Sequence, residues 1–108
     1  MRTIIRAAFL FLLTVHAGVH AQTQNPKVEA AAGERRAAVC FACHNTNGIA
    51  AIPGVPNLAG QKRDYLENAL KAYRDGHTRQ NDIMNAMAGP LSDGDIVNIS
   101  AYFSLLSR

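Results

Sequence analysis

The chain has few of the residues that usually stabilise a small domain. It contains no Trp, Phe and Tyr together make up 6% of it, and its only cysteines are Cys40 and Cys43. A core built mostly of Ala, Leu, Ile and Val is modest in a domain of this length, and such domains usually depend on disulfides, a metal or a cofactor. We therefore expect a group other than the side chains to fill part of the interior.

The first 21 residues have the pattern of a cleaved export signal. Arg2 and Arg6 precede an apolar run over residues 7–15, and Val19-His20-Ala21 matches a signal-peptidase site. An uncleaved membrane anchor is the alternative, but the apolar run is short for a membrane span. We expect cleavage near Ala21.

This division sets the expected domains and the charge of the exported chain. Residues 22–28 are predicted to be a flexible lead-in, and residues 29–108 a single domain. Removing Arg2 and Arg6 leaves nine of the eleven Lys and Arg against eight Asp and Glu, so the net charge falls from +3 to +1. The charges are interspersed, which argues against nucleic acid as a partner, and no stable membrane insertion is expected after cleavage.

Helical patterns account for most of the expected structure. Residues 28–44 are rich in Ala, Glu and Arg, which favours a helix that ends at the cysteines. Residues 62–74 place apolar side chains on one helical face, with Gly76 as the C-terminal stop. Ser92 and Asp95 form an approximate capping box before a terminal helix. With no strand pattern and no internal repeat, an all-α domain is expected.

Residues 45–60, "NTNGIAAIPGVPNLAG", combine residues that break regular structure with apolar ones. Glycines and the prolines Pro53 and Pro56 interrupt any helix or strand. The apolar residues between them are Ile49, Ile52, Val55 and Leu58. Because a solvated loop seldom carries so many, this loop is predicted to wrap over an apolar group.

The stretch "CFACH", residues 40–44, brings two thiols and an imidazole together. A disulfide here would close a very small loop with little stabilisation, and a zinc site lacks a second pair of ligands because His77 is isolated. A thioredoxin-like pair opens a helix after a strand, whereas this pair ends a helix. Cys-x-x-Cys-His is the attachment motif of haem c, in which two thiols add to the vinyl groups and the imidazole reaches the iron. We favour haem c.

The second axial position of the iron has three candidates, His77, Met84 and Met87. A methionine near an apolar helix start is usually a core residue, and a lone loop histidine is usually solvated. The residue types and spacing alone leave the choice open.

Five segments give the chain a family resemblance: "AAVCFACHNTNG", "GVPNLAGQ", "YLENALKAYRDGHTRQND", "IMNAMAGPLSDGDI" and "ISAYFSLL". Together they resemble a class I c-type cytochrome, and are most similar to the single-haem domain that occurs twice in small bacterial dihaem cytochromes of the periplasm. The likeness covers roughly residues 30–106. It implies a class I cytochrome c fold of three to five helices around one covalently bound haem, and a periplasmic location.

The resemblance also implies roles for individual residues. Cys40 and Cys43 would be the thioether anchors of haem c, and His44 the proximal ligand. The distal methionine of such domains falls on Met84, which leaves Met87 as a packing residue.

Two further residues match positions of the family that lie around the haem. Pro56 matches a proline whose carbonyl accepts a hydrogen bond from the proximal imidazole and so fixes its orientation. Arg79 stands where this group commonly has a basic residue, and contact with a haem propionate is one interpretation. A solvated loop charge is the other.

The chain departs from the family pattern at one place. Family members often cross their first and last helices at a small residue with an aromatic residue one turn later, whereas Gly33 is followed by Ala37. Tyr102 and Phe103 on the last helix are expected to compensate.

These roles predict an electron carrier rather than an enzyme. With both axial positions filled by His44 and Met84, substrates do not reach the iron, and the thioether raises the potential relative to two imidazoles. Redox proteins are the expected partners, with a dehydrogenase or membrane-bound reductase as donor and a terminal oxidase or reductase as acceptor. The alternatives are the haem subunit of a periplasmic dehydrogenase complex, or an iron without Met84 that is open to peroxide or gas.

The apolar run over residues 49–53 is a candidate docking surface beside the redox centre. For Ile49 and Ile52 the favoured alternative is that they line the haem pocket.

Overall fold

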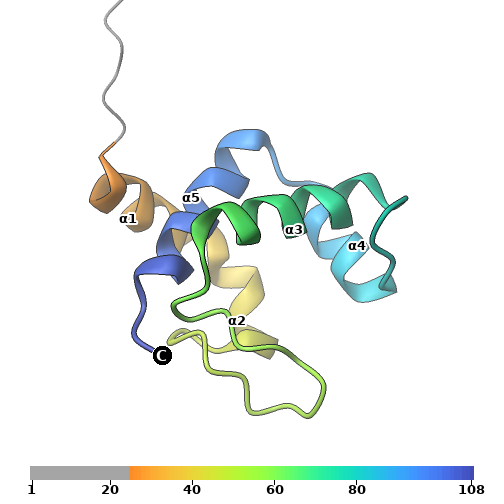
Figure 1. Cartoon of the computed structure of the whole chain (residues 1–108), viewed down its shortest axis with the longest axis horizontal. Coiled ribbons are helices and arrows are strands. Elements are labelled where there is room, and N and C mark those ends of the chain that lie inside the picture. Colours follow the sequence, from red (N-terminus) through yellow and green to blue (C-terminus); the bar gives the residue numbers. More distant parts are fainter. Residues whose placement is uncertain (1–24) are drawn as a thin grey trace, which may run out of the picture.

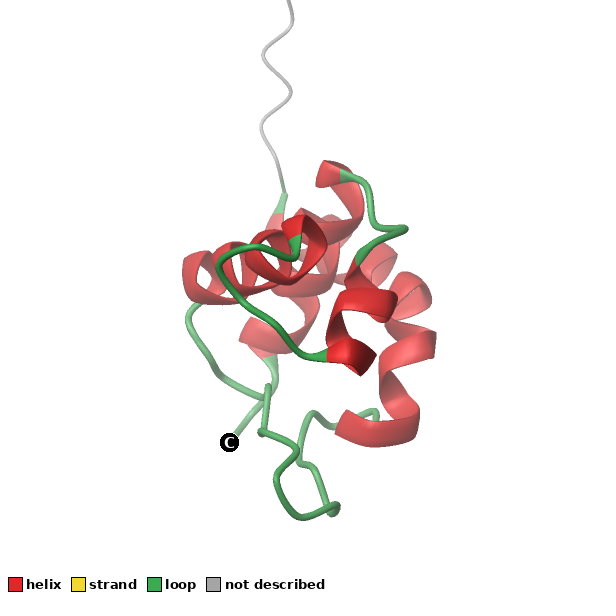
Figure 2. Cartoon of the chain, turned by 90° about the vertical axis from the view of Figure 1, so that its right-hand side faces the viewer, coloured by secondary structure: helices red, strands yellow, loops and turns green. Residues whose placement is uncertain are grey.

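The computed structural model describes residues 25–108, so the predicted export signal lies outside the described residues. Within that range every regular element is helical (Figures 1 and 2). No helix of this part is long and apolar enough to span a membrane. The elements are α1 (Pro26–Arg36), the 3-10 turn η1 (Ala37–Cys40), α2 (Phe41–His44), α3 (Arg63–Asp75), α4 (Asp82–Ala88) and α5 (Asp93–Leu105).

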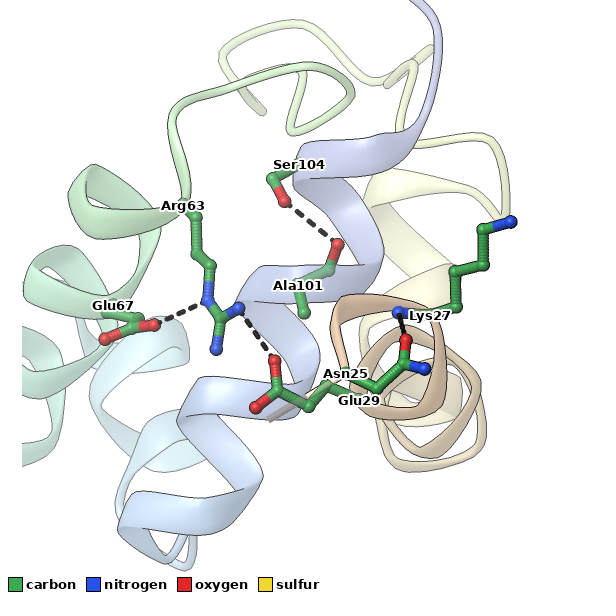
Figure 3. Close-up of polar contacts among 7 residues, drawn as sticks. All are labelled: Asn25, Lys27, Glu29, Arg63, Glu67, Ala101 and Ser104. Atoms are coloured by element: carbon green, nitrogen blue, oxygen red, sulfur yellow. Dashed lines mark hydrogen bonds and ion pairs between the residues drawn. The ribbon is translucent and has the colours of Figure 1, made fainter. Parts of the chain in front are cut away.

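Helix α1 begins two residues earlier than predicted, inside the segment expected to be a lead-in. The side chain of Asn25 accepts a hydrogen bond of 3.0 Å from the amide of Lys27 (Figure 3). Pro26 occupies the first helical position, where its fixed φ favours helix and its missing N–H costs nothing. This capped start explains why the helix reaches Pro26 rather than Val28.

The helix starts and stops predicted for the second half of the chain are confirmed. Gly76 ends α3 in the left-handed conformation, with φ of 70°. Ser92 and Asp95 form the predicted capping box at the start of α5, with reciprocal side-chain to backbone hydrogen bonds of 3.0 Å. These caps rest on local sequence alone, which is why they were predictable.

Helices α1 and α5 cross at a point where only glycine fits. A Cβ on Gly33 would overlap the backbone carbonyl of Asn98. One turn later Ala37 is completely buried, and one turn further Phe41 lies 5.9 Å from the ring of Tyr102 and 6.4 Å from that of Phe103. The predicted compensation by the last helix therefore involves Phe41 as well.

Arg63 joins the first and third helices. Its guanidinium lies 2.7 Å from Glu29 of α1 and 3.0 Å from Glu67 of α3 (Figure 3). The hydrogen bond to Glu29 raises the pKa of Arg63 above its ordinary value. Because Arg63 is about one-third exposed, water screens this bridge and its contribution to stability is modest.

The side-chain core is small and lies mainly along α5 and the helices packed on it. Its largest fully buried apolar side chains are Phe103 and Ile96. The buried cluster consists of Ala37, Leu66, Ala88, Leu91, Ile96, Ile99, Tyr102 and Phe103. Two of these eight are alanines, so the side chains alone fill little volume.

Candidate functional site

The "CFACH" stretch lies on a helix that changes its winding. The chain tightens into the 3-10 turn η1, which ends at Cys40, and then resumes α-helical geometry in α2, which contains Cys43 and His44. Asn45 ends α2 with φ of 58°. Both cysteines are free and half-buried, and burial raises the pKa of the Cys40 thiol. The motif thus ends a helical segment, as predicted.

His44 is buried and oriented by the loop that follows it. Only 5% of the residue is exposed, and its Nδ1 lies 2.9 Å from the carbonyl oxygen of Pro56. A carbonyl only accepts, so Nδ1 carries the proton and donates it. This leaves Nε2 as the nitrogen with a free lone pair, the arrangement that a metal-ligating histidine requires.

The loop over residues 45–61 folds back on itself and so brings Pro56 to His44 (Figure 1). The amides of Leu58 and Ala59 both donate to the carbonyl of Gly48, at 2.8 and 3.1 Å. Gly48 has φ of 69°, and a Cβ there would lie 2.8 Å from the backbone nitrogen of Ala59. Glycine is therefore required at this closure.

A second contact ties this loop to the last helix. The hydroxyl of Tyr102 donates to the carbonyl of Thr46. Tyr102 is also part of the aromatic cluster at the helix crossing. The segment that begins directly after "CFACH" is thus held by α5.

Two segments near the motif carry no ionised residues of their own, although Arg36 and Arg108 from outside them lie against these segments. Residues 37–61 and 83–92 contain no Asp, Glu, Lys or Arg. Within the candidate docking run over residues 49–53, Ile49 is half-buried, whereas Ala51 and Ile52 are exposed, Ile52 to 48%. The run itself is apolar and carries no ionised residue, and the nearest charge described beside it is that of Arg108, next to Ile49.

The candidates for the second axial ligand lie on or before α4, a helix that the sequence did not predict. Met84 is half-buried in its first turn. Met87, one turn later, is 42% exposed, and His77 is exposed in the loop after α3. His77 has the exposed position expected of a solvated loop residue.

Arg79 is not a free loop charge. Its guanidinium lies over two tyrosine rings of α3, 4.9 Å from the centre of Tyr73 and 5.9 Å from that of Tyr65. It also donates a hydrogen bond of 3.3 Å to the hydroxyl of Tyr65, which raises the pKa of Arg79. Stacking of this kind fixes the direction of an arginine side chain.

Two asparagines beside Met84 were not singled out from the sequence. Asn81 caps α4, and its side chain accepts from the amide of Met84 at 3.0 Å. Asn85 bonds to three different backbone groups. The cap was detectable, since asparagine three residues before an apolar helical position is a common helix start.

Comparison with known proteins identifies the family. Residues 30–107 match the cytochrome c family. The chain belongs to the cytochrome c family. It is 49% identical over 78 residues to cytochrome c-554(548) of Halomonas halodenitrificans, covering 70% of this chain and 94% of that protein.

Longer relatives match over part of their length. The solved structure of reduced cytochrome c4 from Pseudomonas stutzeri superposes with a TM-score of 0.68 at 38% identity, covering 72% of this chain and 45% of that one. The chain is 39% identical to a thiosulfate dehydrogenase electron acceptor of Thiomonas intermedia, of which it covers 35%. The predicted resemblance to one haem domain of a dihaem cytochrome is thus confirmed.

Family membership settles the fold and the cofactor. The domain has the class I cytochrome c fold, as predicted. Haem c is bound covalently through Cys40 and Cys43, which are the only cysteines in the chain. The free thiols and the oriented imidazole beside them fit this group. The chain is accordingly an electron-transfer protein that works with redox partners, rather than an enzyme.

Proposed function

We propose that this chain is a periplasmic one-electron carrier whose haem iron is held by His44 and Met84. The observation that carries the proposal is the hydrogen bond from His44 Nδ1 to the carbonyl of Pro56. It orients the ring, keeps the proton on Nδ1 and leaves Nε2 available to the iron. The export-signal pattern of residues 1–21 supports the periplasmic location.

Met84 is the better candidate for the second ligand. It precedes the "LSD" start of α5 at the spacing of the family's distal methionine, and α4 holds it half-buried. A haem iron ligated on both sides supplies one-electron chemistry, and its thioether ligand favours the ferrous state. His44 and Met84 together would leave no position on the iron for a substrate, so exchange of electrons with another protein is the function that remains.

Spectra of two variants test the ligand assignment. The Met-to-iron charge-transfer band of the oxidised protein should disappear in Met84→Ala and persist in Met87→Ala. Loss of the band in Met87→Ala alone would overturn the assignment. Rapid binding of carbon monoxide by the reduced wild-type protein would instead support the open-site alternative.

Residues 49–53 are proposed to form part of the docking surface. A dehydrogenase or membrane-bound reductase is the proposed electron donor, and a terminal oxidase or reductase the acceptor. Ala51 is exposed and uncharged, so Ala51→Glu should slow electron transfer with a physiological partner by placing a charge in an apolar contact. An unchanged rate would remove this surface from the proposal.

The second candidate function is the haem subunit of a periplasmic dehydrogenase complex. It is favoured by the similarity to a protein named as the electron acceptor of thiosulfate dehydrogenase. Purification from the native source distinguishes the two functions. A stoichiometric larger chain would indicate a complex, and a lone haem protein would indicate a free carrier.

A further inference from the structure

The first turn of α4 is closed by two asparagines on either side of Met84. The side chain of Asn81 accepts a hydrogen bond from the amide of Met84 at 3.0 Å. In return, the side-chain oxygen of Asn85 accepts from the amide of Asn81 at 2.7 Å. The backbone of this turn, including the amide of Met84 itself, is therefore held by side chains at both ends.

The side-chain nitrogen of Asn85 donates two hydrogen bonds to residues outside this turn. It donates to the carbonyl of Tyr73 in the last turn of α3, at 2.6 Å, and to the carbonyl of Arg79 in the connecting segment, at 3.0 Å. An amide NH₂ has two hydrogens, so both acceptors are satisfied at once. One side chain thus joins the end of α3, the connection and the start of α4.

A side chain of the segment that connects α3 to α4, residues 76–81, also contacts α3. Arg79, whose carbonyl accepts from Asn85, lies with its guanidinium over the ring of Tyr73. Asn85 thus fixes the backbone of Arg79, and the tyrosine rings of α3 fix its side chain. Helices α3 and α4 are packed on each other in the same region (Figure 1).

We propose that Asn85 is a positioning residue for Met84, which fixes the first turn of α4 to α3 so that the thioether stays in place on the iron. This inference rests on the proposed ligation by His44 and Met84. The chemistry of the network requires an amide, because it needs one acceptor for Asn81 and two donors for the carbonyls of Tyr73 and Arg79. A carboxylate would keep the acceptor but face two carbonyl oxygens without a donor.

Displacement of Met84 by added imidazole tests the proposal on the haem-loaded protein. Asn85→Asp and Asn85→Ala should each bind imidazole at the oxidised iron at least tenfold more tightly than wild type, because the native ligand is held less firmly. Without imidazole, both variants should retain the Met-to-iron band.

Two control variants separate positioning from general stability. Arg63→Met breaks the bridge between α1 and α3, and should lower stability to unfolding without changing imidazole affinity. Asn68→Asp makes the same exchange as Asn85→Asp at an exposed site of α3, and should change neither the stability to unfolding nor the imidazole affinity. If the Asn85 variants lose stability but bind imidazole as wild type does, the inference is wrong while the ligation by Met84 stands.

A second pair of variants keeps the test decisive where Asn85 variants do not fold. Asn81→Ala removes the acceptor for the amide of Met84 and should also tighten imidazole binding. Asn81→Asp keeps that acceptor and should restore the wild-type affinity. If Asn81→Ala and Asn81→Asp bind imidazole with equal affinity, the closed first turn of α4 does not hold Met84, and the proposal is wrong. Retention of the Met-to-iron band in Met84→Ala is a different result, because it would refute the proposed function itself.

Discussion

At the scale of single residues, His44 and the proposed positioning residue Asn85 are oriented by backbone carbonyls. His44 donates to Pro56, and Asn85 donates to Tyr73 and Arg79. A carbonyl cannot be removed by changing its own side chain, so these acceptors are robust to substitution. The orientation of the site therefore depends on the loop conformations that present the carbonyls.

The role of Arg79 is best tested by removing its charge. If the guanidinium stabilises a haem propionate, Arg79→Gln should lower the reduction potential, because a positive charge near the haem favours the reduced state. At the upper end for an exposed charge pair, about 1 kcal/mol, the shift is roughly 40 mV for one electron. Arg79→Lys keeps the charge and should retain most of the potential, and the measurement is a redox titration of each variant. An unchanged potential in Arg79→Gln would leave Arg79 with only its stacking on α3.

At the scale of elements, the crossing of α1 and α5 depends on Gly33. Among the described glycines, it is the one where an added Cβ would come nearest to another atom. Gly33→Ala would push a methyl group into the backbone of Asn98 and force the helices apart. We expect a loss of about 2–3 kcal/mol in the free energy of unfolding, measured by denaturant titration.

Gly94→Ala is the matched control for this prediction. Gly94 lies in the first turn of α5, and a Cβ there would meet only the hydroxyl of Ser92 at 3.8 Å. The same exchange should be neutral, or stabilising by up to about 1 kcal/mol through helix propensity. Equal losses in both variants would contradict the close crossing.

The capping box of α5 predicts a dependence of stability on pH. The hydrogen bond from the backbone of Ser92, assisted by the charge of Arg36, lowers the pKa of Asp95. A carboxyl whose pKa is lowered in the folded state contributes its full stabilisation of the fold above its unfolded pKa of about 3.9. That contribution is lost as the pH falls through the pKa of the folded state. Asp95→Asn keeps an acceptor for the amide of Ser92 but loses the negative charge, so it should cost about 0.3–1 kcal/mol at pH 7 and progressively less below about pH 4. A constant difference across this range, in denaturant titrations of both proteins, would exclude the carboxylate as the cause.

The elements also show what sequence patterns can and cannot predict. Helices α3 and α5 were predictable because their caps and apolar faces are local. Helix α4 was missed because it is only seven residues long, between the polar residues 77–81 and the breaker pair Gly89-Pro90, and so shows no helical period of its own. The contacts of Asn85 and Arg79 join residues that are brought together only by the packing of α3 and α4, and no spacing in the sequence encodes them.

At the scale of the whole molecule, the small core makes the domain dependent on its haem. The buried cluster includes two alanines and only three aromatic or aliphatic side chains that are at most 2% exposed: Ile96, Ile99 and Phe103. Without the apolar mass of the porphyrin, chain entropy should outweigh burial. The double variant Cys40→Ala/Cys43→Ala should lose most of its helical circular dichroism. A cooperative thermal transition at the wild-type midpoint would show that the polypeptide folds without attachment.

The absence of ionised residues from 37–61 and 83–92 has a consequence for how fast this carrier meets its partners. Charged patches steer proteins together and make association fall steeply with added salt, whereas uncharged surfaces associate at about 10⁵–10⁶ M⁻¹s⁻¹ with little such dependence. We expect the second-order rate of electron transfer to change less than about threefold between low and physiological ionic strength. Stopped-flow measurement over a salt series tests this, and a tenfold fall would show that charges elsewhere on the chain guide the encounter. A carrier of this kind would associate with its partners more slowly than a charged one, but its rate of electron transfer would stay nearly constant when the salt concentration of its surroundings changes.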